Sequence, residues 1–180
     1  MKLTPFSFKV SVWVLIVFLC GCDVFYRLLH KEGAEEKDNL GEIVPYEANE
    51  RVIEVQKLLK LYGYKIGKVD GVLGVNTRNA IAEFQADNGI QVSRFVDNAT
   101  WNELHIYEDY GLVRDGDLDI QTIQKALTLA GTDPGPVDGK LGRRTQAAVK
   151  DFQKKQGLHS DGRVGLKTLQ QLLKYVSPDS

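Results

Sequence analysis

The residues best suited to chemistry in this chain are acidic turn residues that occur twice. An Asp-Gly pair stands at 70–71 and again at 138–139, each followed by a threonine, Thr77 or Thr145. A calcium loop would need several more oxygen ligands at alternating positions, and neither segment supplies them. Asp and Gly begin tight turns, and threonine is able to cap the helix that follows. We therefore expect a mainly structural role for both pairs.

Histidine and cysteine offer little further chemistry. His30, His105 and His159 stand singly, with no carboxylate or cysteine partner at metal-ligand spacing, and are expected at the surface. Both cysteines, Cys20 and Cys22, lie near the N-terminus, which excludes a disulfide framework or a four-cysteine zinc site further along. The sequence predicts no cofactor, no metal site and no catalytic residue.

The elements that must position the acidic turns form one unit that occurs twice. A chain of 180 residues has room for one ordinary domain or two small ones. An offset of 68 residues aligns the second half with the first without a gap, and brings Gln56 onto Gln124 and Phe84 onto Phe152. A register held over the whole unit indicates a tandem repeat.

The sequence pattern of each copy predicts three short helices. Apolar residues recur at helical spacing in the first helix of each copy, and a glycine, Gly63 or Gly131, follows where that helix should stop. The second helix is expected to begin near Thr77 or Thr145, and the third contains Leu104 or Leu172. The predicted fold class is all-α, with two tandem small three-helix domains at 50–107 and 118–176.

The motif Asp-Gly-x-x-Gly-x-x-Thr-x-x-Ala-[Ile/Val]-x-x-Phe-Gln occurs at 70–85 and again at 138–153. It resembles the three-helix peptidoglycan-binding domain found in bacterial wall hydrolases, which implies peptidoglycan as the partner. Copy one departs from the pattern at 93–97, so its late loop, and any ligand contact there, stays open. The candidate ligand-binding residues are Asp70, Thr77, Arg78, Gln85, Asp138, Arg143, Arg144, Thr145 and Gln153.

Charge is unevenly distributed along the chain. The net charge of −1 argues against nucleic acid as a partner. Residues 120–172 contain nine bases and four acids, whereas 105–119 contain five acids and one base. Peptidoglycan presents carboxylates and acetamido groups, so a basic face containing Arg143 and Arg144 suits it. An ordinary solvated helix face explains the same charges equally well.

Two further interpretations concern the surface of the repeats. The acidic connector, 108–117, is able to fold onto copy two and mask its basic residues. Tyr62, Tyr64 and Tyr107 are candidates for a sugar-stacking platform in copy one. Alanine and threonine replace the first two in copy two, which argues against a shared stacking mechanism.

The N-terminus has the form of a targeting segment. Lys2 and Lys9 precede an apolar run over 10–19, as in a secretory signal. Leu19-Cys20-Gly21-Cys22 resembles the bacterial lipobox, which implies lipidation of Cys22 and removal of residues 1–21. In enteric-type bacteria, Asp23 after that cysteine resembles a signal for retention at the inner membrane. An uncleaved signal anchor is the alternative.

A flexible acidic tether is predicted over 22–49, with a short helix near Phe25–His30 and a fully stretched length of roughly 90 Å.

Together, the repeat, the motif and the leader favour a non-catalytic, lipid-anchored protein of the bacterial envelope, facing the periplasm or the outside, that binds peptidoglycan. In the resembling hydrolases the catalytic domain is a separate segment, and the predicted segments, including the tail 177–180, leave no room for one. The alternative is an adaptor or regulator that recruits a cell-wall hydrolase or another envelope protein by protein–protein contact.

Overall fold

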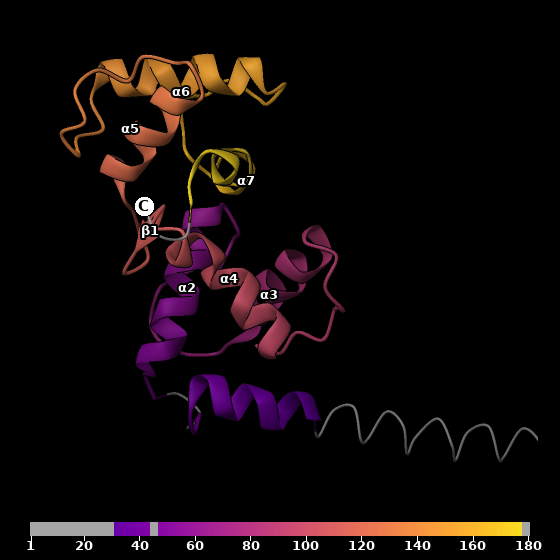
Figure 1. Ribbon diagram of the computed structural model, residues 1–180. Coiled ribbons are helices and arrows are strands. Elements are labelled where there is room, and N and C mark those ends of the chain that lie inside the picture. Colours follow the sequence, from indigo (N-terminus) through magenta and orange to yellow (C-terminus); the bar gives the residue numbers. More distant parts are fainter. Residues whose placement is uncertain (1–30, 44–46, 178–180) are drawn as a thin grey trace, which may run out of the picture.

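The computed structural model describes residues 31–43 and 47–177, and it confirms the all-α prediction (Figure 1). A first helix covers residues 31–40. Repeat one consists of α2 (Glu50–Tyr62), α3 (Val75–Asp87) and α4 (Asn98–Asp109). A hairpin of β1 (Val113–Arg114) and β2 (Asp117–Leu118) follows. Repeat two consists of α5 (Ile120–Leu129), α6 (Arg143–Lys155), α7 (Leu166–Leu172) and the short 3₁₀ helix η1 (Leu173–Tyr175).

Local signals fix both ends of α2. The Asn49 side chain accepts hydrogen bonds from the amides of Arg51 and Val52, which have no partner inside the helix. Gly63 then takes a left-handed conformation with φ 101°, and its amide donates to the carbonyls of the last turn. Between these ends, an apolar stripe that includes Val55 and Leu59 is fully buried.

The second helix of each repeat begins two residues earlier than predicted. Gly74 and Gly142 occupy the N-cap positions in extended conformation, and neither helix has a side-chain cap. Thr77 and Thr145 lie inside the first turn and are buried. The prediction that these threonines cap the helices was therefore wrong. Their hydroxyls face the interior, where they accept hydrogen bonds from the buried side chains of Gln56 and Gln124.

One hydrophobic core extends through both repeats. In repeat one, Tyr62 packs edge-on against Tyr107, with ring centroids 5.4 Å apart, and its hydroxyl donates to the Leu104 carbonyl at 2.6 Å. Between the repeats, Gln170 donates a hydrogen bond to Asn88 at 3.3 Å. Tyr62 and Tyr107 are thus core residues, and the proposed sugar-stacking platform is reduced to the half-buried Tyr64.

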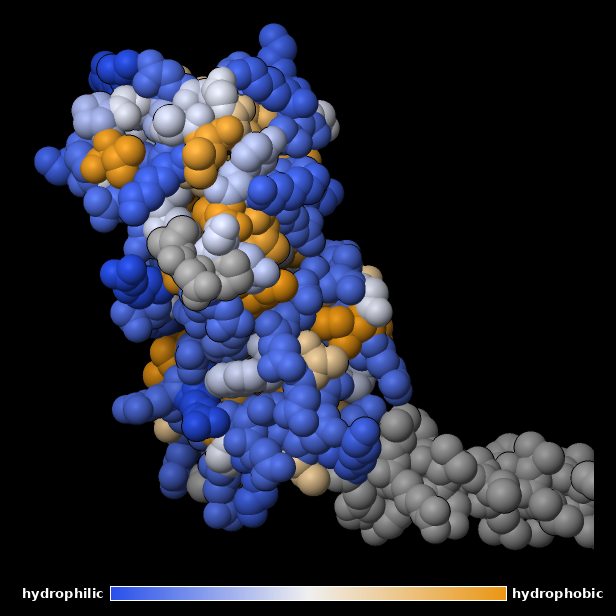
Figure 2. Space-filling view, viewed as in Figure 1, coloured by the Kyte–Doolittle hydropathy of each residue, from blue (hydrophilic) through white to orange (hydrophobic). Residues whose placement is uncertain are grey.

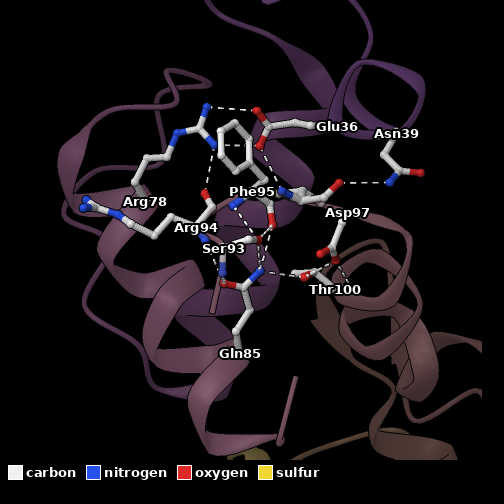
Figure 3. A network of polar contacts seen from close by, with 10 residues as sticks. Glu36, Asn39, Arg78, Gln85, Ser93, Arg94, Phe95, Asp97 and Thr100 are labelled. Carbon is white, nitrogen blue, oxygen red and sulfur yellow. Dashed lines mark hydrogen bonds and ion pairs between the residues drawn. The ribbon is translucent and has the colours of Figure 1, made fainter. Parts of the chain in front are cut away.

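Residues 31–40 are not a flexible tether. They form a helix that packs against repeat one, and its last residue, Leu40, is 1% exposed. Glu36 accepts two hydrogen bonds from the Arg78 guanidinium, at 2.7 and 2.9 Å, and a third from the amide of Val96 (Figure 3). No local pattern pointed to this packing, because the partners lie about 40 to 60 positions away.

The remaining N-terminal predictions concern residues that the structure does not describe. These are the leader 1–21, Cys22, the short helix near Phe25–His30 and the rest of the tether up to residue 30. Among the described helices, none combines the length and the apolar character needed to cross a membrane.

The acidic connector folds mainly against repeat one, and its hairpin shares a surface pocket with Gly139 of copy two. It continues α4 and then forms the β1–β2 hairpin, in which Val113 pairs with Leu118. Leu112 and Val113 are buried, and the hairpin packs against α2 and α4 of repeat one. The prediction that this segment masks the basic residues of copy two was therefore wrong.

Candidate functional site

A buried glutamine organises the Asp-Gly turn of repeat one. The side-chain amide of Gln56 donates to Asp70 Oδ1 at 3.0 Å, the Val72 carbonyl at 3.1 Å and Thr77 Oγ1 at 3.1 Å. Its Oε1 accepts from the amides of Asp70 and Gly71. One side chain thereby satisfies most of the polar groups that this turn would otherwise bury without partners.

Repeat two contains the same arrangement around Gln124. Its amide donates to Asp138 Oδ1 at 3.0 Å and to Thr145 Oγ1 at 3.2 Å, and its Oε1 accepts from the Gly139 amide. Hydrogen bonds from backbone amides and from the glutamines lower the pKa values of both Asp70 and Asp138. These features are consistent with the expected structural role of the Asp-Gly pairs.

A second buried glutamine in each repeat holds the loop before the third helix. Gln85 donates to Ser93 Oγ, to the Phe95 carbonyl and to Thr100 Oγ1, at 2.8–3.0 Å (Figure 3). Gln153 makes the equivalent contacts in repeat two, with Asp161, the Arg163 carbonyl and Thr168.

The late loop of copy one, which departs from the family pattern, has the same form as its counterpart. Arg94 takes a left-handed conformation with φ 69°, where repeat two has Gly162 at φ 79°. Ser93 Oγ binds Gln85 in place of the carboxylate of Asp161. The two loops therefore have the same backbone conformation although these two positions carry different residues.

The structure separates the candidate ligand-binding residues into those that hold the fold and those that face solvent. Thr77, Gln85, Thr145 and Gln153 are buried and bonded inside their repeats. Asp70 and Asp138 shape the turns. Arg78 is held by Glu36, and Arg144 lies 2.5 Å from the Asp133 carboxylate.

Arg143 differs from the other candidates. It is exposed at the first position of α6 and forms no ion pair within the described part of the chain. Gln56 and Gln124, by contrast, are absent from the residues predicted from the sequence. Their recurrence at the repeat offset was the signal that could have identified them.

A groove of about 530 Å³ lies where the two repeats meet. The end of α2, the loop after it and the end of α3 contribute Lys60, Tyr64 and Asp87, and the region around the start of α7 contributes Arg163 and Lys167. The Tyr64 hydroxyl donates to Asp87 at 3.0 Å, so that carboxylate already has a partner. Within the described residues, none of the three cations forms an ion pair. Asp161 also lines the groove, which thus combines three cations and two carboxylates beside an aromatic ring.

The face of the molecule in Figure 2 is mainly hydrophilic, and apolar side chains form patches separated by hydrophilic ones. Exposed large apolar residues include Val137 and Leu141, which are each 40% exposed on the loop before α6. Such isolated residues are normal on a protein surface and do not by themselves indicate a binding face.

Comparison with known proteins bears on both repeats. A family model described as "Putative peptidoglycan binding domain" matches residues 48–104 and 116–172, which is more than half of the chain. The chain belongs to this peptidoglycan-binding domain family. The two peptidoglycan-binding domains correspond to α2–α4 and to α5–α7.

One curated relative is an N-acetylmuramoyl-L-alanine amidase, CwlM, of Mycobacterium tuberculosis (strain ATCC 25618 / H37Rv). The alignment extends over 103 positions with 33% identity and covers 52% of this chain and 25% of the amidase. The chain thus spans about a quarter of the length of that relative. No solved structure gives a significant match.

The first peptidoglycan-binding domain also contains a polar cluster outside the groove. The side chain of His105 is only 12% exposed and stacks on Trp101, with ring centroids 4.0 Å apart. Its Nε2 lies 3.3 Å from Glu54 and 3.8 Å from Glu108. The prediction of an isolated surface histidine was wrong for His105, because Glu108 lies one turn along the same helix and Glu54 approaches from α2. His159 is exposed as predicted, and His30 lies outside the described residues.

Proposed function

We propose that this protein is a non-catalytic, lipid-anchored component of the bacterial envelope that binds peptidoglycan in the groove between its two domains. The supporting observation is that both domains contribute to one groove whose cations, Lys60, Arg163 and Lys167, lack ion-pair partners among the described residues. Residues from either domain alone would form only one wall of the groove.

The chemistry of the groove suits the polymer. Stem-peptide and lactyl-derived carboxylates pair with guanidinium and ammonium groups, and Arg163 is able to hold a carboxylate through two hydrogen bonds. The half-buried ring of Tyr64 offers an apolar face beside these charges, and a sugar ring stacks on such a face. A ligand that contacts both domains would engage them together, rather than as two independent weak sites.

The non-catalytic part of the proposal rests on how the recurring polar residues are used. The polar atoms of the four buried glutamines and their threonine partners are engaged in hydrogen bonds that hold loops inside the domains. The match to the amidase covers only a quarter of that protein, so its activity is not transferred to this chain.

Sedimentation with purified insoluble sacculi tests the binding site. The full chain, in a mild non-ionic detergent, is compared with the groove variant Arg163→Ala plus Lys167→Ala. We expect the variant to lose at least tenfold in affinity, and we expect wild-type binding to weaken as salt rises. A control, Lys125→Ala plus Lys154→Ala, removes the same charge from exposed positions outside the groove and should bind like the wild type.

Other outcomes would reassign the site or the function. Loss of binding in Arg143→Ala plus Arg144→Ala, with the groove variant unaffected, would move the site to the start of α6. Absence of sedimentation at any salt concentration would favour the adaptor hypothesis, in which the same fold recruits a cell-wall enzyme. Clearing of a peptidoglycan-containing gel by the purified chain would contradict the non-catalytic assignment.

The lipid anchor is tested separately at the adjacent cysteines. We expect Cys22→Ser to abolish incorporation of a palmitate analogue and to leave the leader attached, whereas Cys20→Ser should change neither. The reverse pattern would contradict the assignment of Cys22.

The distance between the anchor and the domains is also limited. Residues 31–40 pack on repeat one, so only the chain from Cys22 to residue 31 is left to act as a tether, and it extends at most about 30 Å. The anchored domains would stay much closer to the membrane than a free tether allows.

A further inference from the structure

Three potential metal ligands converge between two helices of the first domain. Glu54 comes from α2, and His105 and Glu108 come from α4, one turn apart. One ligand atom from each residue lies within 4.8 Å of the other two. The side chains are 40%, 12% and 20% exposed, respectively, so the cluster is partly sheltered but open to entry from solvent.

A backbone contact fixes which nitrogen of His105 faces the carboxylates. Nδ1 lies 2.7 Å from the Trp101 carbonyl, which can only accept, so Nδ1 must carry a proton. In the neutral ring, Nε2 then presents a lone pair toward Glu54 and Glu108. Three electron-pair donors facing one another require a positive charge between them, either a proton on Nε2 or a metal ion. Metal-binding histidines commonly donate their other N–H to a backbone carbonyl in this way.

The spacing of the ligand atoms fits a tetrahedral ion. Zinc binds nitrogen and oxygen ligands at about 2.0–2.2 Å, so two ligands of a tetrahedral site lie about 3.3–3.6 Å apart. The Nε2 to carboxylate distances here are 3.3 and 3.8 Å. The two carboxylates lie within 4.8 Å of each other, so the three ligand atoms have to close by at most about 1.5 Å to occupy three corners of a tetrahedron, with the fourth left for water.

The second domain shows that the fold does not need this cluster. At the repeat offset, Glu54, His105 and Glu108 correspond to Thr122, Leu173 and Val176. The same helix–helix position is therefore closed without carboxylates or imidazole in repeat two. The polar set in repeat one thus represents an added feature, and one that brings two carboxylates close together at a cost in electrostatic repulsion.

We propose that Glu54, His105 and Glu108 form a site for a divalent transition-metal ion of the zinc type, specific to the first domain. The other carboxylate oxygen of Glu108 accepts a hydrogen bond from the Gly116 amide at 3.2 Å. The ion would therefore connect α2, α4 and the hairpin that leads into repeat two. Its role is structural: it fixes the junction from which the second domain extends.

Calorimetric titration of zinc chloride into the chelator-treated full chain, in detergent, tests the site. We expect one zinc ion per chain, and binding at least tenfold weaker in Glu54→Gln and in Glu108→Gln. The melting temperature of the wild type should rise by roughly 5–10 °C with zinc at a hundredfold excess over Kd. Cobalt(II) should give the visible absorption of a tetrahedral complex, which His105→Leu abolishes.

A variant that copies the residues of repeat two separates loss of the site from loss of the fold. Glu54→Thr plus His105→Leu plus Glu108→Val should keep the helical circular dichroism and bind no zinc. His159→Ala plus His30→Ala removes the other imidazoles and should bind zinc like the wild type. Unchanged zinc binding in the triple variant, loss of binding in the histidine control, or no saturable uptake by the wild type would each overturn the proposal. The last result would mean that a proton alone occupies the cluster.

Discussion

At the scale of single residues, buried glutamines explain most of what the sequence motif specifies. A glutamine offers two N–H donors and a carbonyl oxygen at the end of a flexible stem, so it matches the mixed donors and acceptors of a loop. Gln56 and Gln85 each bind three acceptors and two backbone amides in repeat one. The partners of Gln56 include Asp70, Gly71 and Thr77, which recur in the motif, and Gln85 is itself the last residue of the motif. The motif therefore mainly specifies the hydrogen-bond networks around these two buried glutamines.

Substitution of the motif glycines should have unequal effects in the two repeats. Gly71 and Gly139 have nearly the same left-handed φ, 74° and 72°. A Cβ on Gly71 would lie 2.8 Å from the Asn49 amide nitrogen, whereas a Cβ on Gly139 would meet nothing within 4 Å. We expect Gly71→Ala to lower the free energy of unfolding by about 2–4 kcal/mol and Gly139→Ala by about 1–2 kcal/mol. Urea unfolding measures both, and equal losses would contradict the close contact at Gly71.

At the scale of elements, the helix over 31–40 is an addition to repeat one. Its Glu36 reaches the Arg78 guanidinium and the loop before α4, and Asn39 donates to the Val96 carbonyl at 2.9 Å. The equivalent of Arg78 in repeat two is Gln146, which has no such partner helix to bind among the described residues. The arginine that the sequence suggested as a ligand contact is therefore held by the chain itself.

Removal of the Glu36 charge should loosen this helix. Glu36→Gln keeps the size of the side chain but leaves Arg78 without its carboxylate partner, so we expect a loss of about 1–3 kcal/mol in unfolding free energy. Glu35→Gln is the matched control. Glu35 pairs with the exposed Lys31 at 3.5 Å and accepts a hydrogen bond from the Asn98 amide at 3.3 Å. Glutamine keeps an acceptor for that amide, so loss of the charge should cost less than about 1 kcal/mol. Denaturant titration compares the two losses in unfolding free energy. Equal losses would show that the Glu36–Arg78 pair stabilises the fold no more than a surface ion pair does.

At the scale of the whole molecule, the two repeats share a core and form a groove between them. Each repeat is near the lower size limit for independent folding. The hydrophobic cluster runs from α2 to α7 without a break, and Gln170 of repeat two contacts Asn88 of repeat one. Binding in the groove would therefore depend on the relative placement of the two domains as well as on their individual residues.

A shared core predicts one cooperative unfolding transition. In Trp13→Phe, Trp101 of repeat one is the single tryptophan, so fluorescence follows that repeat alone, while far-ultraviolet circular dichroism follows both. We expect the two signals to give coincident urea midpoints. Distinct midpoints would show that the repeats unfold as separate units. Such a result would weaken the case for a ligand that needs both.

The repeat, the helical class and the family could all be predicted from the sequence, because these depend on periodic apolar residues and on local turn chemistry. Gly63 ends α2 as its position predicts, and the Asp-Gly pairs form the turns expected of them. Those features are encoded within a few neighbouring residues, and the repeat offset made them visible twice.

Which polar residues face inward and which face a ligand became clear only from the packing of the helices. Thr77 and Gln85 are polar in the sequence but buried by partners 15 to 21 positions away. His105 has Glu108 one turn along the same helix, but its other carboxylate partner, Glu54, is 51 residues away in the sequence. The packing of residues 31–40 and the groove at Arg163 arise in the same way. Contacts between distant segments depend on how helices pack, and no local pattern in the sequence specifies that packing.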